Sequence, residues 1–155
     1  MCIRDSIGGG INTDSFSSLV CCNFIDNSAT FGGGLSVTDF QGSVTINYSS
    51  FLNNTAQNSG GGVRLTTSGN NALVYVTGSA FINNTASFGG GVYYASSGQY
   101  ASMKVTETVF RNNTATTSQE SSRNTIYGGG VSMFGDSSYI SVDTSDFSMN
   151  SASGS

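Results

Sequence analysis

Carboxylates are the first side chains to consider for chemistry, because cleavage of glycosidic bonds requires paired or clustered Asp and Glu residues. The nine acidic residues are mostly scattered along the chain, and a local group forms only at Asp136, Asp143 and Asp146. This spacing is typical of a solvated turn, so we predict no catalytic residue and a protein that is not an enzyme. The alternative is a fragment of a carbohydrate-active β-helix enzyme, similar to a polysaccharide lyase or hydrolase, that lacks its catalytic part.

Glycine triplets are a second candidate, because glycine-rich loops bind phosphate through their backbone N–H groups. The triplets begin at five positions: Gly8, Gly32, Gly60, Gly89 and Gly128. None is followed by the Lys-Ser/Thr pair of a P-loop, and the Gly-Gly-x-Gly-x-Asp calcium repeat is absent. The sequence has no His, and its three cysteines (Cys2, Cys21 and Cys22) lack zinc-ligand spacing. We therefore predict no cofactor and no metal site.

The charge pattern excludes two further classes. The net charge is -4, and the five basic residues are scattered, whereas nucleic-acid binding needs a basic stripe that neutralises phosphates. A membrane span needs about 18 consecutive apolar residues, and the sequence has no such run. We expect no nucleic-acid partner and no membrane span in this chain. The cysteine count leaves the disulfide state of Cys21 and Cys22 open.

The strongest pattern is an internal repeat, Phe-x-x-Asn-x-Ala, which alternates with the glycine triplets. Its Phe residues are 27, 30, 29 and 37 residues apart. The repeated positions are Phe24, Phe51, Phe81, Phe110 and Phe147, with Asn27, Asn54, Asn84, Asn113 and Asn150. We predict that both sets point inward, as a stacked aromatic column and a hydrogen-bonded amide column. Residues that recur at the same position in all five copies of the motif are predicted to be structural rather than catalytic.

Short strands must hold these residues in place. Apolar-x-apolar pairs such as Val63/Leu65 follow four of the triplets, and a second pair such as Val74/Val76 lies seven and five residues before each later Phe. The parity of these positions predicts a bend three or four residues before Phe. Each period then holds two or three short strands. Coils stacked about 4.8 Å apart give a parallel sheet on each face.

These observations predict an all-β fold, a right-handed single-stranded parallel β-helix of about five coils. Residues 1–7 match nothing in the repeat and are a non-repeat start, whereas residues 8–155 form the repeat region. An insertion at residues 116–127 is polar and is predicted to be a surface loop. Both ends look cut within the repeat, so we expect an interior fragment with open end coils that self-associate end to end.

The pairing of Phe-x-x-Asn with Gly-Gly-apolar over residues 8–152 resembles the repeats of chlamydial polymorphic outer membrane proteins. More broadly, it is similar to right-handed β-helix proteins of the pectin-lyase type. The resemblance implies an autotransporter passenger that acts in adhesion. The chain departs from that family in having few cysteines and no segment like the translocating barrel.

We therefore expect an extracellular or cell-surface repeat region that serves adhesion, display or scaffolding. Its partner is expected to be a host or matrix protein or a glycan, bound through a lateral face or through residues 116–127. Asparagine sequons at Asn47, Asn53, Asn83 and Asn112 are candidate glycosylation sites. Strand alternation places the last three outward. Among the tyrosines, Tyr94 is expected in the core and Tyr75 and Tyr93 outside.

Overall fold

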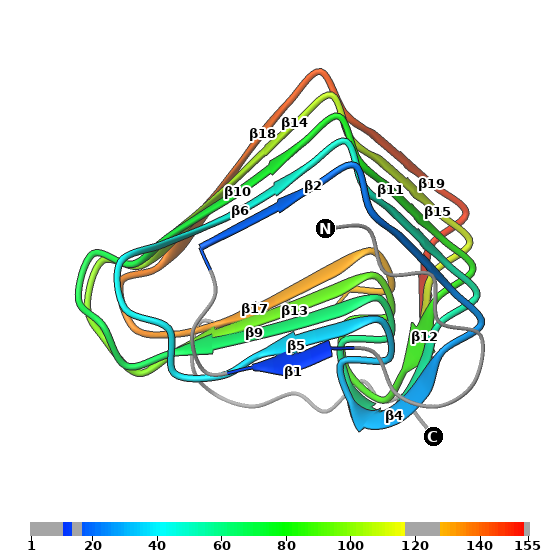
Figure 1. The fold of residues 1–155 in the computed structure, drawn as a ribbon, viewed down its shortest axis with the longest axis horizontal. Helices are drawn as coiled ribbons and strands as arrows, with labels where there is room; N and C mark the ends of the chain where they lie inside the picture. The colour runs from blue at the N-terminus through cyan, green and yellow to red at the C-terminus, as the bar shows by residue number, and fades with distance from the viewer. Residues whose placement is uncertain (1–10, 14–16, 117–127, 154–155) are drawn as a thin grey trace.

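The computed structural model describes residues 11–13, 17–116 and 128–153 of the chain. These residues form four parallel sheets of five strands each and contain no helix. Successive turns of the chain lie one behind another when viewed along the axis of the coil (Figure 1). The fold is a parallel β-helix of about five coils, as the sequence predicts. The predicted start at residues 1–7 and nearly all of the 116–127 insertion lie outside the described residues.

Each full coil contributes one strand to each sheet, in the order A, B, C, D. Sheet A contains β1 (Ile11–Thr13), β5 (Leu35–Val37), β9 (Val63–Thr67), β13 (Val92–Ser96) and β17 (Val131–Phe134). Sheet B contains β2 (Ser18–Val20), β6 (Ser43–Asn47), β10 (Leu73–Thr77), β14 (Ser102–Thr106) and β18 (Tyr139–Asp143). Sheet C contains β3 (Asn23–Ile25), β7 (Ser50–Leu52), β11 (Ala80–Ile82), β15 (Val109–Arg111) and β19 (Asp146–Ser148). Sheet D contains β4 (Ser28–Phe31), β8 (Thr55–Ser59), β12 (Thr85–Ala86), β16 (Thr114–Ala115) and β20 (Ser151–Ala152).

The predicted bend before Phe lies between sheets B and C. Its corner residue, three positions before each Phe, has a positive φ in every coil: Cys21, Tyr48, Gly78, Glu107 and Thr144. A second corner, two positions after Phe, also has a positive φ in every coil: Asp26, Asn53, Asn83, Asn112 and Met149. This second corner separates sheet C from sheet D. The prediction of two or three strands in each coil was therefore too low, and the coil has four.

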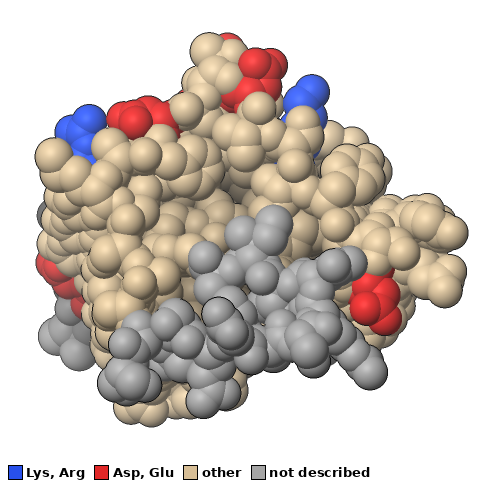
Figure 2. All heavy atoms as spheres, turned by 180° about the vertical axis from the view of Figure 1, so that it is seen from behind, with Lys and Arg blue, Asp and Glu red and all other residues tan. Residues whose placement is uncertain are grey.

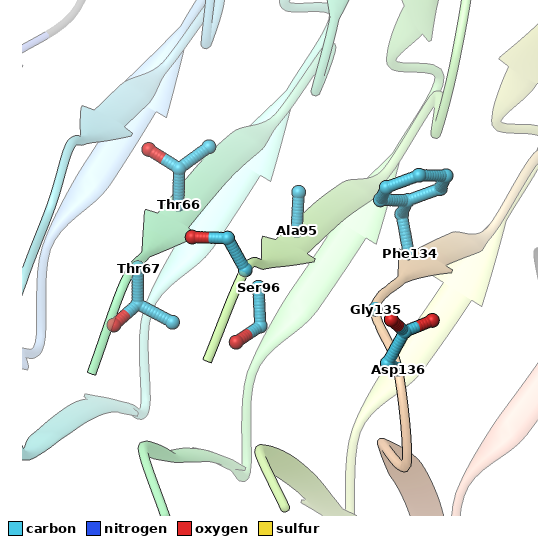
Figure 3. Close-up of a pocket in the computed structure, with 8 residues that line it drawn as sticks. Thr66, Thr67, Ala95, Ser96, Phe134, Gly135 and Asp136 are labelled. Atoms are coloured by element: carbon cyan, nitrogen blue, oxygen red, sulfur yellow. The ribbon is translucent and has the colours of Figure 1, made fainter. Parts of the chain in front are cut away.

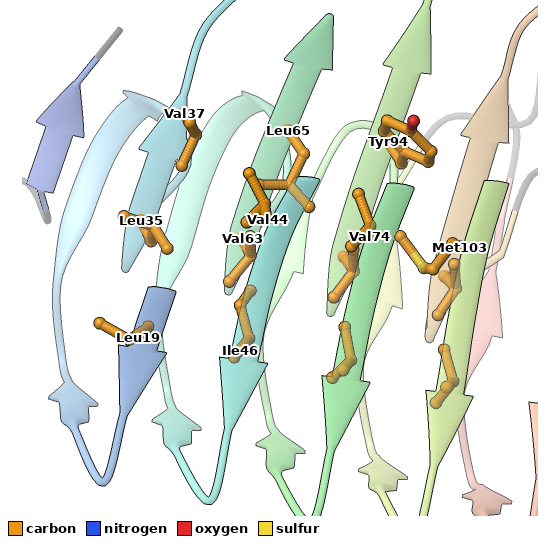
Figure 4. Packing of buried hydrophobic residues seen from close by; sticks show 14 of the residues in the cluster. Leu19, Leu35, Val37, Val44, Ile46, Val63, Leu65, Val74, Tyr94 and Met103 are labelled. Atoms are coloured by element: carbon orange, nitrogen blue, oxygen red, sulfur yellow. The ribbon is translucent and has the colours of Figure 1, made fainter. Parts of the chain in front are cut away.

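Much of the core lies between sheets A and B, whose inner side chains point toward one another (Figure 4), and the buried Phe residues of sheet C belong to the same cluster. Leu65 of β9 and Val74 of β10 are buried, as are the corresponding residues of the neighbouring coils. Tyr94 of β13 is completely buried among them, in register with Leu65 and Met133. Because the sheets are parallel and in register, each inner position repeats along the axis. One apolar pair in each strand is therefore enough to build a continuous core.

The glycine triplet couples one coil to the next, as Gly60 to Gly62 illustrate. Gly60 has a φ of 69°, a conformation that side chains disfavour. A Cβ atom on Gly61 would lie 2.4 Å from the carbonyl oxygen of Gly90. A Cβ atom on Gly62 would lie 3.0 Å from the Cδ1 atom of Phe81, the aromatic residue of the following coil. The triplet and the Phe motif thus alternate because they pack against each other.

Candidate functional site

The repeated phenylalanines form a continuous column inside sheet C. Phe51 and Phe81 stack with ring centroids 4.8 Å apart and planes within 2° of parallel. The Phe24–Phe51 and Phe81–Phe110 pairs have the same centroid separation. The ring centroids of Phe110 and Phe147 are 4.5 Å apart. All four rings are buried, whereas Phe147 in the last coil is 43% exposed. The column therefore stabilises the stack and offers a ligand no surface along most of its length.

The repeated asparagines form a second buried column, in which Asn84 is typical. Its Nδ2 group donates to the carbonyl oxygen of Phe51 and to Oδ1 of Asn113, each at 2.9 Å. Its Oδ1 atom accepts hydrogen bonds from the backbone N–H and the Nδ2 group of Asn54. The same pattern runs from Asn27 to Asn150. These side chains form hydrogen bonds with their neighbours in the stack, so their role is structural.

The sequons of the repeat lie on the second corner of the coil. Asn53, Asn83 and Asn112 are exposed, and Asn47 is half-buried at the end of β6. The Nδ2 group of Asn53 donates to Oδ1 of Asp26, and that of Asn83 donates to Oδ1 of Asn53. A second, external amide row therefore runs along this corner. Attachment of a glycan to Asn53 or Asn83 would use an amide nitrogen that this row also uses, and glycosylation stays a prediction.

The acidic residues do not gather into a catalytic or metal site in the described part of the chain. Asp136 precedes β18, whereas Asp143 and Asp146 flank the bend after it, so the length of this strand separates them. Asp146 forms an exposed ion pair with Arg111, 3.7 Å away. Within the described ranges, no three His, Cys, Asp or Glu side chains lie close enough together to hold a metal ion. No described helix is long and apolar enough to cross a membrane.

The described tyrosines lie in different parts of the coil. Tyr75 is exposed in the middle of β10, Tyr48 lies at the corner between sheets B and C, and Tyr100 lies in the connection before β14. Tyr94 is buried, as its parity predicts, and burial raises its pKa to about 12. Its hydroxyl donates to the carbonyl oxygen of Ala72 at 3.4 Å. Tyr93 is half-buried on the outer face of sheet A.

A solvent-open pocket of about 380 Å³ lies where β9, β13 and β17 end. Figure 3 shows its lining, in which Thr66, Ala95 and Phe134 project to the same side of the sheet. These three residues occupy one register row across the three strands. Phe134 is 42% exposed, and the exposed residue Asp136 follows one position after Gly135. The pocket therefore combines an aromatic ring, a carboxylate and hydroxyl groups.

Two of the lining hydroxyls already have backbone partners. The Thr67 hydroxyl donates to the carbonyl oxygen of Phe40 and accepts from the N–H of Gly69. The Ser96 hydroxyl donates to the carbonyl oxygen of Gly98 and accepts from its N–H. Both residues are buried and hold the connections that follow their strands. The other polar or aromatic side chains in the lining are those of Thr66, Ser97, Phe134 and Asp136.

Beside this pocket, Arg64 and Tyr93 form the preceding outer row of the same sheet. The Arg64 guanidinium lies over the ring of Phe31, with its Cζ atom 4.8 Å from the ring centroid. Desolvation lowers the Arg64 pKa, and the charge of nearby Tyr93 offsets part of this effect. The Arg64 Nε atom is buried and has no hydrogen-bond partner among the described residues. The guanidinium therefore packs on Phe31, the last residue of β4.

No motif in the sequence predicts this pocket. Phe134 is a departure from the repeat, since Ala95 and Thr66 hold the equivalent positions. Figure 2, which views the molecule from behind, shows few charged side chains and no patch of a single sign on the visible described surface. The pocket on sheet A is thus a lateral concavity with mixed aromatic and polar character.

Comparison with known proteins places one repeat of this chain. Residues 48–65, which span a Phe motif, a glycine triplet and the start of β9, match the Chlamydia polymorphic membrane protein repeat. No curated protein and no solved structure matches the chain. The match lies within the second and third coils described above, where the Phe column and the glycine triplet meet. The chain is therefore a parallel β-helix that resembles polymorphic membrane protein repeats.

Proposed function

We propose that the chain is a surface-exposed or secreted β-helical repeat region that binds a partner through the outer face of sheet A and does not catalyse a reaction. The observation that carries this proposal is the pocket at the ends of β9, β13 and β17. The inner repeated positions are engaged in coil-to-coil contacts. Function is therefore assigned to positions that depart from the repeat on a lateral surface, as in other solenoids.

The surface location rests on the likeness of residues 48–65 to a repeat of membrane-associated proteins. Adhesion is the role that this likeness suggests. The composition agrees, because a polar surface with few charges suits contact with many neutral partners. The absence of enzymatic activity is inferred from the pocket, whose described lining residues include a single carboxylate, that of Asp136. General acid-base cleavage of a glycan uses two.

Binding of the purified full chain to cultured epithelial cells and to immobilised matrix proteins tests the proposal. A Phe134→Ala/Asp136→Asn double variant is expected to lose most of the binding. Tyr75→Ala is the matched control, because Tyr75 is exposed to a similar extent (38%) on sheet B. Equal binding by the double variant and the unaltered chain would remove the pocket from the proposal. Turnover of any polysaccharide by the unaltered chain would overturn the non-enzymatic assignment.

A further inference from the structure

We propose that the pocket at the ends of β9, β13 and β17 binds a neutral saccharide of one or two pyranose rings, with one ring stacked on Phe134. This inference names the ligand class of the site in the proposed function and rests on it. It is argued from the ring, the polar groups around it, the local charge and the size of the hollow.

The ring of Phe134 is placed to act as a stacking surface. Phe134 ends β17, and its register neighbour on β13 is the short side chain of Ala95, with Thr66 beyond it on β9. Because these neighbouring side chains are small, the surface beside the ring lies lower than the ring, and a hollow forms there (Figure 3). The C–H face of a pyranose is apolar and flat, and an aromatic ring held beside a step buries such a face.

The polar groups around the ring suit a ligand that carries many hydroxyls. Asp136 supplies a carboxylate that accepts hydrogen bonds, and such charge-assisted bonds are strong. Thr66 and Ser97 supply hydroxyls that both donate and accept. Because Thr67 and Ser96 use their hydroxyls to hold backbone groups, the floor of the pocket is fixed in position. A fixed floor lowers the entropic cost of ordering the site when it binds.

The charge of the site favours a neutral sugar over an acidic one. Among the described residues that line the pocket, Asp136 is the only charged one, and the whole chain has a net charge of -4. Arg64, in the next outer row of sheet A, has its guanidinium over the ring of Phe31 at the end of β4. A carboxylated sugar placed on Phe134 would therefore meet Asp136, and no described lining residue carries a compensating positive charge.

The size of the hollow limits the ligand to a short saccharide. Its volume is about 380 Å³, near the lower end of the range for small-molecule pockets. It is open to solvent along one side, so the sugar can be the end of a longer chain. An aromatic side chain of a protein partner is a competing occupant. The experiment separates the two.

Ligand-observed saturation-transfer NMR on the full chain, followed by titration, tests the inference. The probes are cellobiose and N-acetyllactosamine as neutral disaccharides and digalacturonate as an acidic one. We expect saturation transfer to at least one neutral disaccharide, strongest at the C–H protons of a single ring. Digalacturonate is expected to bind at least about tenfold more weakly, because two like charges oppose its approach.

Variants then assign the site. Phe134→Ala is expected to lower the affinity for the neutral sugar about tenfold, whereas Phe134→Tyr is expected to retain that affinity. Asp136→Asn should lower the affinity for the neutral sugar by a smaller factor. It should also reduce the difference in affinity between the neutral sugar and digalacturonate. Tyr75→Ala should leave both unchanged. Circular dichroism of each variant shows whether the fold is retained, and Phe134→Tyr guards against loss of folding in Phe134→Ala.

Three results would overturn the inference: no saturation transfer to either neutral disaccharide, equal or tighter binding of digalacturonate, or neutral binding that survives Phe134→Ala. The first result combined with loss of cell binding in the double variant would leave the pocket as a protein-binding site. In that case the saccharide assignment fails while the proposed function stands. If the double variant loses sugar binding but retains cell binding, the saccharide assignment stands, and the pocket is not the surface that binds cells.

Discussion

The inner coils and the last described coil carry the same motif in different surroundings. Phe81 in the third Phe motif is completely buried, whereas Phe147 in the fifth is 43% exposed. Val76 of β10 is buried, and Val142, its counterpart on β18, is 50% exposed. The motif therefore does not bury itself. Burial is supplied by the coil on either side, and the last described coil has a described neighbour on one side only.

This difference creates an apolar hollow at the C-terminal end of the stack. Its volume is about 520 Å³, and its lining includes Val142, Phe147 and Met149. In the inner coils the space next to each Phe is filled by the following Phe at 4.8 Å. Stability in such a stack is approximately a sum of contributions from single coils and from their interfaces. The same substitution should therefore cost more in an inner coil than in the last.

The largest contrast is expected from removal of one ring. Phe81→Ala should lower the free energy of unfolding by about 3–5 kcal/mol, because the ring is enclosed and the cavity cannot collapse freely. Phe147→Ala should cost about 1 kcal/mol, since its ring has already kept much of its contact with water. Urea unfolding followed by circular dichroism measures both. Equal costs would show that the whole stack unfolds without distinct interfaces.

A smaller effect is expected from the pH dependence of an inner coil. Burial raises the pKa of Tyr94 to about 12 from an ordinary value of 10.0, so the folded state favours the neutral phenol. This contribution is complete below about pH 10 and is lost as the pH rises from about 10 to about 12. The loss should amount to about 2–3 kcal/mol. Unfolding measured between pH 9 and pH 12 tests it.

Tyr94→Phe is the control for this experiment, because it removes the titrating hydroxyl and keeps the ring. The variant should lose less stability over the same pH range than the unaltered chain. Parallel curves for the two proteins would show that Tyr94 ionises without cost in the folded state. Met133 occupies the equivalent position in the last coil, so this titration reports on the inner coils alone.

A matched pair of glycines gives the next contrast. A Cβ atom on Gly91 would lie 2.4 Å from the carbonyl oxygen of Gly130, which is backbone and cannot move aside. A Cβ atom on Gly130 would meet only side chains, the nearest being the half-exposed ring of Phe147 at 3.0 Å. Gly91→Ala should cost about 1–3 kcal/mol and Gly130→Ala less than about 1 kcal/mol. Thermal unfolding of both variants checks this, and the reverse order would contradict it.

The smallest effect is expected from the ion pair that joins the last two coils. Arg111 and Asp146 are 3.7 Å apart, and about half of each side chain is exposed. Exposed pairs of this kind contribute little, so Asp146→Asn should cost at most about 0.5 kcal/mol. The difference should vanish in 1 M salt, which screens exposed charges (about 3 Å Debye length). A cost above 1 kcal/mol that persists in salt would mean that the pair orders the whole interface.

The repeat in the sequence was enough to predict the coil, because each repeated position has the same environment in every inner coil. Alternation correctly placed Tyr94 inside and Tyr75 outside. The bend before Phe was also recoverable from parity. These features depend only on contacts between equivalent residues, so a single sequence contains the information several times.

The second corner and the pocket were not recoverable in this way. Residues as different as Asp26, Asn83 and Met149 have a positive φ at the second corner. The stack imposes this conformation, and local preference explains it only at Asn and Asp. The pocket depends on Phe134 standing beside Ala95 and Thr66, which belong to different coils. Such a neighbourhood follows only after the register between coils is known.

The direction of the hydrogen bonds between coils has a mechanical consequence. The amide of Asn54 bonds to Asn84, 30 residues away, and the N–H of Tyr48 bonds to the carbonyl of Thr77 in the next coil. A force that pulls the two chain ends apart therefore opens one coil at a time, as a zipper does, and leaves the others folded. Each released coil of 30 residues adds about 100 Å of extended chain. Under tension, the stack becomes a tether that lengthens by one coil at each step.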